Sequence, residues 1–174
     1  MVLTHRFNIM KTKLIFIVLF LVLFCSCQRT LPDELLTMSR ISYTGKEIRT
    51  DGCFVSDPGE TKKYCTYCFF YRNGVYFHIS DKLDIENIYQ FTGGIDIYRN
   101  SKDNWGLFQV KVDKIEIQSW ASNVVAIQYI LNNRMLYVKN DTTLYEQISN
   151  TNNVRYYHFK KFGQKPDSTN VFIK

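Results

Sequence analysis

The chain of 174 residues contains very little alanine, proline and glycine. It has two alanines, three prolines and eight glycines, against 12 tyrosines and 13 phenylalanines. So few prolines and glycines exclude collagen-like and low-complexity material. The shortage of alanine, the best helix former, argues against a helical bundle. Because β-branched and aromatic residues suit the pleated surface of a sheet, and because the length is that of one domain, the composition predicts a single all-β domain.

The motifs of the common enzyme classes are also missing. The chain has no His-Glu-x-x-His helix, no Gly-x-Ser-x-Gly elbow, no phosphate-binding glycine loop and no dinucleotide fingerprint. His78 and His158 lie in strand-like segments beside aromatic residues, where histidine is commonly structural or exposed. We therefore expect no catalytic residue, no metal site and no cofactor, and expect that the protein is not an enzyme. An enzyme would need one of these histidines beside a carboxylate in a cleft.

One long apolar run lies near the N-terminus. Leu14 to Phe24 are eleven uninterrupted apolar residues, and they follow the basic Lys11 and Lys13. A helix of this length rises about 16 Å, roughly half of the ~30 Å apolar core of a bilayer. The pattern therefore predicts a secretory signal helix, and we expect residues 1–27 to form a signal peptide.

The residues after this run predict lipidation. Ser26-Cys27 resembles the end of a bacterial lipobox, where cleavage before the cysteine leaves a thiol and an amino terminus that carry acyl chains such as palmitate. Ordinary secretion and an uncleaved anchor are the alternatives. We expect a lipid anchor at Cys27 and a tether over residues 28–47. The expected location is the cell envelope, on the inner or outer membrane and facing either the periplasm or the cell surface.

The positive charge of the chain is divided unevenly. The whole chain carries +6, from 22 basic and 16 acidic residues. Three of the basic residues and none of the acidic ones lie in residues 1–27, so 19 basic and 16 acidic residues remain after cleavage. This remainder is spread over predicted turns and strand faces. We therefore expect no nucleic-acid partner.

The rest of the chain alternates strand-like runs with turn signals, which is typical of a β-barrel or sandwich. We expect a barrel-like domain over residues 48–165 and a C-terminal tail over residues 166–174. One short helix is predicted near residues 82–91, between a Ser-Asp cap and a Thr-Gly-Gly stop. The predicted strands are 48–56, 64–71, 74–79, 95–99, 105–112, 115–120, 124–131, 134–139, 142–148 and 154–161.

The turn residues of two predicted hairpins can be assigned from the sequence. A two-residue turn at residues 113–114 separates an apolar face from a polar one and places Lys111 opposite Glu116, a stabilising cross-strand pair. A second two-residue turn is expected at residues 132–133, where two asparagines tolerate the left-handed backbone that such turns need.

Besides the acylated Cys27, three cysteines remain once the signal peptide is removed, and they lie at positions 53, 65 and 68. Pairing of the first two predicted strands brings Cys53 near Cys65 or Cys68, and an oxidising compartment favours a disulfide there. Buried free thiols are the main alternative. A zinc site or a redox pair at Cys65 and Cys68 is disfavoured, because residues three apart on a strand point to opposite faces.

Several stretches, weak singly and recognisable together, resemble a group of short Bacteroidota lipoproteins with lipocalin-like domains. The resemblance implies a small antiparallel β-barrel or half-barrel and supplies no functional residues. It concerns architecture alone, since Trp105 precedes Gly106 and the Gly-x-Trp signature of true lipocalins is missing. The matching stretches are residues 49–52, 70–76, 105–110, 115–120, 140–143 and 165–170.

Two functions follow from this fold class. A barrel of about eight strands can enclose a small ligand, and the many aromatic residues favour an apolar or aromatic one. The alternative is a protein-interaction or structural module of the envelope without a ligand pocket. An exposed apolar patch on residues 64–77 would favour that alternative.

Overall fold

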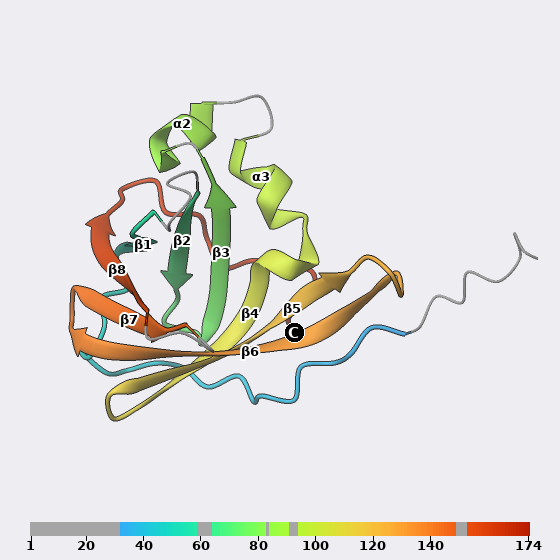
Figure 1. Ribbon diagram of the computed structural model, residues 1–174, viewed down its shortest axis with the longest axis horizontal. Helices are drawn as coiled ribbons and strands as arrows, with labels where there is room; N and C mark the ends of the chain where they lie inside the picture. Colours follow the sequence, from blue (N-terminus) through green and yellow to red (C-terminus); the bar gives the residue numbers. More distant parts are fainter. Residues whose placement is uncertain (1–31, 59–63, 83, 91–93, 149–152) are drawn as a thin grey trace, which may run out of the picture.

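The computed structural model describes residues 32–174 except 59–63, 83, 91–93 and 149–152. Eight antiparallel strands follow one another around a closed barrel, in which β8 pairs with β1 (Figure 1). The strands are β1 (Gly52–Ser56), β2 (Cys65–Phe70), β3 (Val75–Asp81), β4 (Trp105–Lys111), β5 (Lys114–Asn123), β6 (Gln128–Asn140), β7 (Thr143–Gln147) and β8 (Val154–Lys161). The helices are α2 (Ile85–Gln90), α3 (Gly94–Arg99) and the 3-10 helix η1 (Lys102–Asn104). The predicted all-β meander is confirmed, and it closes into a small lipocalin-like barrel.

One buried cluster occupies the inside of the barrel. Every strand contributes to it, because alternate residues of a strand face the same side. The strand residues of this cluster are Phe54, Cys68, Phe70, Tyr76, Phe108, Ile115, Ile117, Leu136, Leu144 and Tyr157, and Tyr43 and Ile48 from the N-terminal segment complete it.

A second buried cluster covers the outer face of β1 to β4. It contains Tyr67 and Phe69 of β2, whose side chains point away from the barrel interior, together with Ile85 and Ile88 of α2. Strands β1 to β3 are therefore largely buried on both faces, whereas in β8 only Tyr157 is fully buried. The predicted helix is present at Ile85–Gln90 and packs on this outer face, above β2 and β3 in Figure 1.

The prediction of a strand at residues 95–99 is wrong, because this segment is helix α3. Its sequence alternates in polarity, but Ile95 and Tyr98 pack together against the outer cluster, as residues three apart on a helix do. Ile97 between them is 62% exposed. Packing against the barrel has overridden the local pattern.

The turn predicted at residues 132–133 is also wrong. Both asparagines lie inside the long strand β6, opposite Ser119 and Gln118 of β5. Gln118 Nε2 donates to Asn133 Oδ1 at 3.0 Å, so this asparagine stabilises the ladder. The chain turns instead at residues 124–127, and the β5–β6 hairpin projects beyond the barrel (Figure 1).

The other hairpin turns one residue earlier than predicted. Lys111 lies opposite Lys114, so the turn is formed by Val112 and Asp113. This shifts the register by two residues and leaves each side chain on its predicted face. Lys111 and Glu116 still form an ion pair, at 2.6 Å, but diagonally across the ladder.

The segment expected to act as a tether is docked on the barrel from residue 32 onward. It has no regular secondary structure over residues 32–47 and runs along the strands as an extended chain (Figure 1). Glu34 N donates to Tyr129 O at 2.9 Å, and Gln118 Oε1 accepts from the backbone of Thr37 at 2.7 Å. This part of the chain therefore belongs to the folded domain.

The C-terminal segment is also held against the barrel. Lys165 Nζ donates to the carbonyl oxygens of Thr50 and Phe70 at 2.6 and 2.7 Å. Phe172 and Ile173 pack against the outer cluster. Residues 166–174 therefore help to cover the strands.

Candidate functional site

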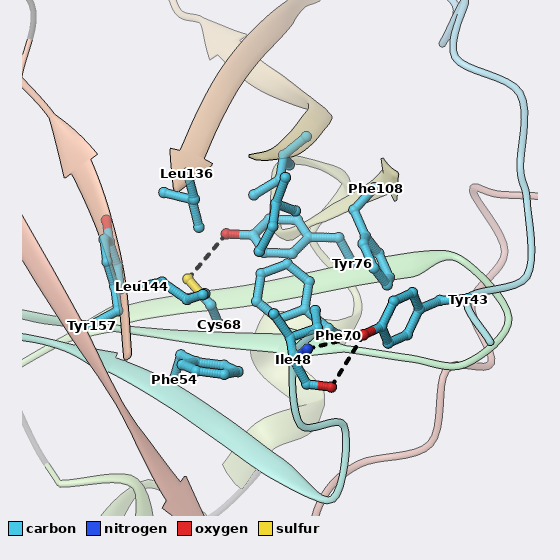
Figure 2. Close-up of a cluster of buried hydrophobic side chains, with 12 residues drawn as sticks. Tyr43, Ile48, Phe54, Cys68, Phe70, Tyr76, Phe108, Leu136, Leu144 and Tyr157 are labelled. Carbon is cyan, nitrogen blue, oxygen red and sulfur yellow. Dashed lines mark hydrogen bonds between the residues drawn. The ribbon is translucent and has the colours of Figure 1, made fainter. Parts of the chain in front are cut away.

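Aromatic rings fill the middle of the barrel, where a lipocalin-like protein would hold an apolar ligand. The ring of Phe70 lies 5.0 to 5.9 Å, centroid to centroid, from those of Phe54, Tyr76 and Phe108. Figure 2 shows these rings together with Tyr43, which lies 5.9 Å from Phe108. The interior is thus a packed core at this level, and a candidate binding site has to be sought nearer the rim.

A polar cluster lies at one edge of this core. Arg134 of β6 and Glu146 of β7 form two parallel hydrogen bonds, of 3.1 and 3.0 Å. Arg134 also donates to the hydroxyls of Tyr157 at 2.8 Å and Tyr76 at 3.3 Å. Tyr157 in turn donates to Glu146 at 2.7 Å. Four strands therefore contribute side chains to one connected hydrogen-bond network.

Strand alternation explains why two charged residues point inward. Arg134 lies two residues before the buried Leu136, and Glu146 lies two residues after the buried Leu144. Residues two apart share a face of the sheet, so each charged side chain points into the barrel on the same face as the neighbouring leucine. Sequence reasoning missed this pair, although the two leucines carried a signal for it. The incorrect turn at residues 132–133 prevented the prediction that Arg134 and Glu146 lie side by side.

The barrel opens beside this pair because β6 is much longer than β7. Among the described residues, strand β7 pairs with β6 only from Tyr137 onward, and the earlier half of β6 pairs with no strand but β5. A cleft of about 520 Å³ lies where the two strands separate. Its lining is mostly polar and consists of Asn132, Asn133, Arg134, Met135, Tyr137, Glu146 and Gln147.

The charges in the cleft neutralise each other. Burial alone would raise the pKa of Glu146, but the hydrogen bonds and charge of Arg134 hold that pKa below its ordinary value. The pKa of Arg134 is raised by the groups around it, against the effect of burial. Their side chains are 17% and 18% exposed. The cleft thus offers a fixed ion pair and several amides with no net charge.

The two histidines occupy different environments. His78 points into the barrel, stacks on Tyr76 with ring centroids 5.4 Å apart, and has no hydrogen-bond partner at Nδ1. Burial lowers the pKa of His78 to about 4, so its ring is neutral at pH 7. His158 lies on the outer surface, with its Nε2 3.6 Å from Asp57 Oδ1. Both His158 and Asp57 are more than half exposed, so they do not form a buried acid–base pair.

The expected disulfide is not present, since Cys53, Cys65 and Cys68 are free thiols. Cys68 lies opposite Phe54, so it faces the barrel interior, whereas Cys53 faces the outer cluster. Cys65 shares the outer face but lies four residues along β2 from the position opposite Cys53, about 13 Å away. That separation is well beyond the Cα distance of a disulfide.

Burial disfavours the reactive thiolate form of Cys53 and Cys68. It raises the pKa of Cys53 to about 12 and raises that of Cys68 as well. The Cys68 sulfur lies 3.2 Å from the Tyr76 hydroxyl, on the side of the polar cluster (Figure 2). Within the described residues, no three His, Cys, Asp or Glu side chains come together as a metal site would require.

The aromatic strand residues 64–77 do not form the exposed patch that a partner-binding edge would need. Phe69, Phe70, Tyr76 and Phe77 are each at most 1% exposed, and Tyr64 alone is more than half exposed. A partly exposed aromatic row lies elsewhere. Across the outer face of β6, β7 and β8 the rings of Tyr137, Tyr145, Tyr156 and His158 follow one another at 5.1 to 6.4 Å.

Cys27, the predicted lipidation site, lies outside the described residues. Among the helices that are described, none has the length and apolar character needed to cross a bilayer. Comparisons with protein-family models, curated proteins and solved structures give no match.

Proposed function

We propose that this protein is a cell-envelope lipoprotein, acylated at Cys27, whose barrel acts as a non-enzymatic binding module for a neutral sugar. The observation that carries the binding proposal is the cleft between β6 and β7, where the Arg134–Glu146 pair adjoins the amides of Asn132, Asn133 and Gln147. Its volume of about 520 Å³ lies within the usual range for small-molecule sites.

The chemistry of the cleft favours a polyhydroxylated ligand over the apolar one expected at first. An amide offers both donors and acceptors, and so does each hydroxyl of a sugar. The Arg134–Glu146 pair has no net charge, so neither a strong anion nor a strong cation is favoured. Apolar ligands would compete with Phe70 and its neighbours for the barrel interior, which these rings already fill.

The test begins with the protein purified from the cells that make it. Its intact mass should show acyl chains on Cys27, and native mass spectrometry should reveal any retained ligand. Titration with neutral mono- and disaccharides, followed by amide NMR, should then shift the signals of residues 132–137 and 146–147. Asn133→Ala and Gln147→Ala should weaken binding at least tenfold, since both side chains are exposed and line the cleft.

Gln164→Ala provides the matched control, because Gln164 is an exposed amide that does not line the cleft. It should leave the affinity unchanged. Absence of shifts at the cleft with every sugar would refute the binding proposal. An intact mass that shows Cys27 without acyl chains would refute the anchor separately.

A protein-interaction module is the second candidate, and the aromatic row on β6 to β8 favours it. Tyr137 and Tyr145 stack nearly parallel, with 18° between their planes, so their ring faces are covered by each other. Such a row offers edges and hydroxyls to a partner surface rather than open ring faces to a sugar. Cross-linking in intact envelopes from a photoreactive group at Tyr156 would capture that partner.

A further inference from the structure

The tip of the β5–β6 hairpin is apolar and stands in solvent. Val124 is 83% exposed, Val125 96% and Ile127 49%. No Asp, Glu, Lys or Arg occurs from residue 117 to residue 133, so the whole projecting end of the hairpin is uncharged. Figure 1 shows this hairpin reaching away from the barrel. Exposed clusters of this kind mark contact surfaces more often than isolated apolar residues do.

The backbone at the tip adds a second observation. Ile127 has φ = 49°, in the left-handed region that Gly, Asn and Asp adopt readily and β-branched residues do not. An asparagine at this position would suit both the turn and the solvent better. The turn therefore keeps an apolar side chain at a cost in conformational energy.

The N-terminal segment is fastened directly behind the tip. Tyr129 N donates to Asp33 Oδ1 at 3.0 Å, and Leu131 N donates to Glu34 Oε2 at 2.6 Å. Trp120 Nε1 donates to the Glu34 carbonyl at 2.7 Å. The segment that begins at residue 32 starts near the tip of the hairpin and runs from there back along the barrel in Figure 1. The chain thus reaches the barrel on the side of the hairpin.

This attachment limits how far the hairpin can lie from the predicted anchor. Cys27 is six residues before Asp33, and six fully extended residues span about 20 Å. Asp33 is itself neutralised by Lys102, whose Nζ lies 2.6 Å from its Oδ2. Glu34, the other acid of this contact, is exposed and keeps its charge, and its Oε2 accepts a hydrogen bond from Leu131 N.

We propose that Val124, Val125 and Ile127 at the tip of the β5–β6 hairpin insert into the interface of the membrane that holds the acyl chains of Cys27. This proposal rests on the proposed lipidation. The acyl chains supply the attachment, and the hairpin tip supplies a second contact that fixes how the barrel is oriented on the surface. The cleft between β6 and β7 then has a defined orientation relative to the membrane.

The test uses the full acylated protein in vesicles of phosphatidylethanolamine and phosphatidylglycerol, with a nitroxide label on Val125→Cys. Cys65→Ser removes the partly exposed native thiol, and Cys53 and Cys68 are buried. The matched control is the label on Val112→Cys, because Val112 is 90% exposed at the tip of the β4–β5 hairpin, far from the β5–β6 tip in Figure 1.

The expected result is that oxygen relaxes the label at position 125 strongly and a water-soluble nickel chelate does so weakly, as in lipid. The label at position 112 should show the reverse. Equal exposure of both labels to the nickel chelate would overturn the proposal. A label at 125 shielded from oxygen and nickel alike would also overturn it, since that indicates burial against protein.

Two controls separate the causes of a negative result. Intact mass reports acylation of Cys27 in the same sample, so loss of the anchor is distinguished from failure of the tip to insert. Circular dichroism of both labelled variants should match the parent protein, because both sites are exposed turn positions.

Discussion

Arg134 and Glu146 face each other across the point where β6 and β7 separate, and their two hydrogen bonds close the inner side of the cleft. Both side chains are more than four-fifths buried. Each charge depends on the other, because removing one partner leaves an uncompensated charge in a poorly hydrated site. The pair therefore matters to the fold as well as to the proposed site.

Glu146→Gln should lower the free energy of unfolding by about 3 kcal/mol, the usual cost of breaking a largely buried ion pair on one side. The double variant Arg134→Met with Glu146→Gln should recover part of this loss, since it removes both charges. Urea unfolding of the parent, single and double variants at pH 7 measures the difference. A single variant as stable as the parent would show that water already solvates Arg134 in the cleft.

His78 should make the fold sensitive to mild acid. Burial lowers its pKa from 6.5 to about 4 in the folded protein. Between these values the unfolded chain binds a proton that the folded chain does not, so stability falls as pH decreases from about 6.5 to 4. The loss reaches about 3 kcal/mol at the lower end.

His78→Gln should remove this contribution, and the stability difference between parent and variant should therefore change with pH over that window. Urea unfolding at several pH values, with NMR titration of the His78 ring, measures it. Carboxylates also titrate there, so the comparison with the variant isolates the histidine. A His78 ring that titrates near 6.5 in the folded protein would contradict the prediction.

The free cysteines should differ in reactivity. Cys65 is partly exposed, whereas Cys53 and Cys68 are fully buried and burial raises the pKa of both. A thiol reagent at pH 8 should therefore modify one cysteine in the folded protein and three after unfolding without reductant. Mass mapping of the modified peptides identifies them. Fewer than three reactive thiols after unfolding would indicate a disulfide that the structure does not contain.

The sequence was sufficient to predict the barrel because its signals are local and repeated. Sparse alanine, alternating strands and frequent turn residues all favour the same fold class. The helix α2 lies within the predicted range, although Ser80 and Asp81, the residues predicted to cap it, belong to strand β3. The incorrect turn at residues 113–114 had little effect on the predicted faces of the two strands. A two-residue shift keeps every side chain on its face, and so Lys111 still reaches Glu116.

The cleft was not predictable from the same signals because it depends on strand lengths. Asn132 and Asn133 have a strong turn preference, yet their cross-strand partners hold them inside β6. Whether residues 132–133 form a turn or belong to β6 decides whether β6 extends beyond β7. It therefore also decides whether the Arg134–Glu146 pair lies at an opening of the barrel. Local preference cannot settle a question of pairing between distant strands.

Substitution of Val112 should stabilise the folded protein. It has φ = 60°, a conformation that costs a β-branched residue about 1–2 kcal/mol, and its side chain is 90% exposed and therefore contributes little burial. Val112→Gly removes the strain, although glycine also gains freedom in the unfolded chain, so the net stabilisation should be about 0.5–1 kcal/mol.

Val112→Ala keeps the Cβ and should gain less, which makes it the matched control. Thermal and urea unfolding of the three proteins would show the order glycine, alanine, valine from most to least stable. An equal stability of all three would mean that the β4–β5 turn relaxes to a conformation in which Val112 is unstrained.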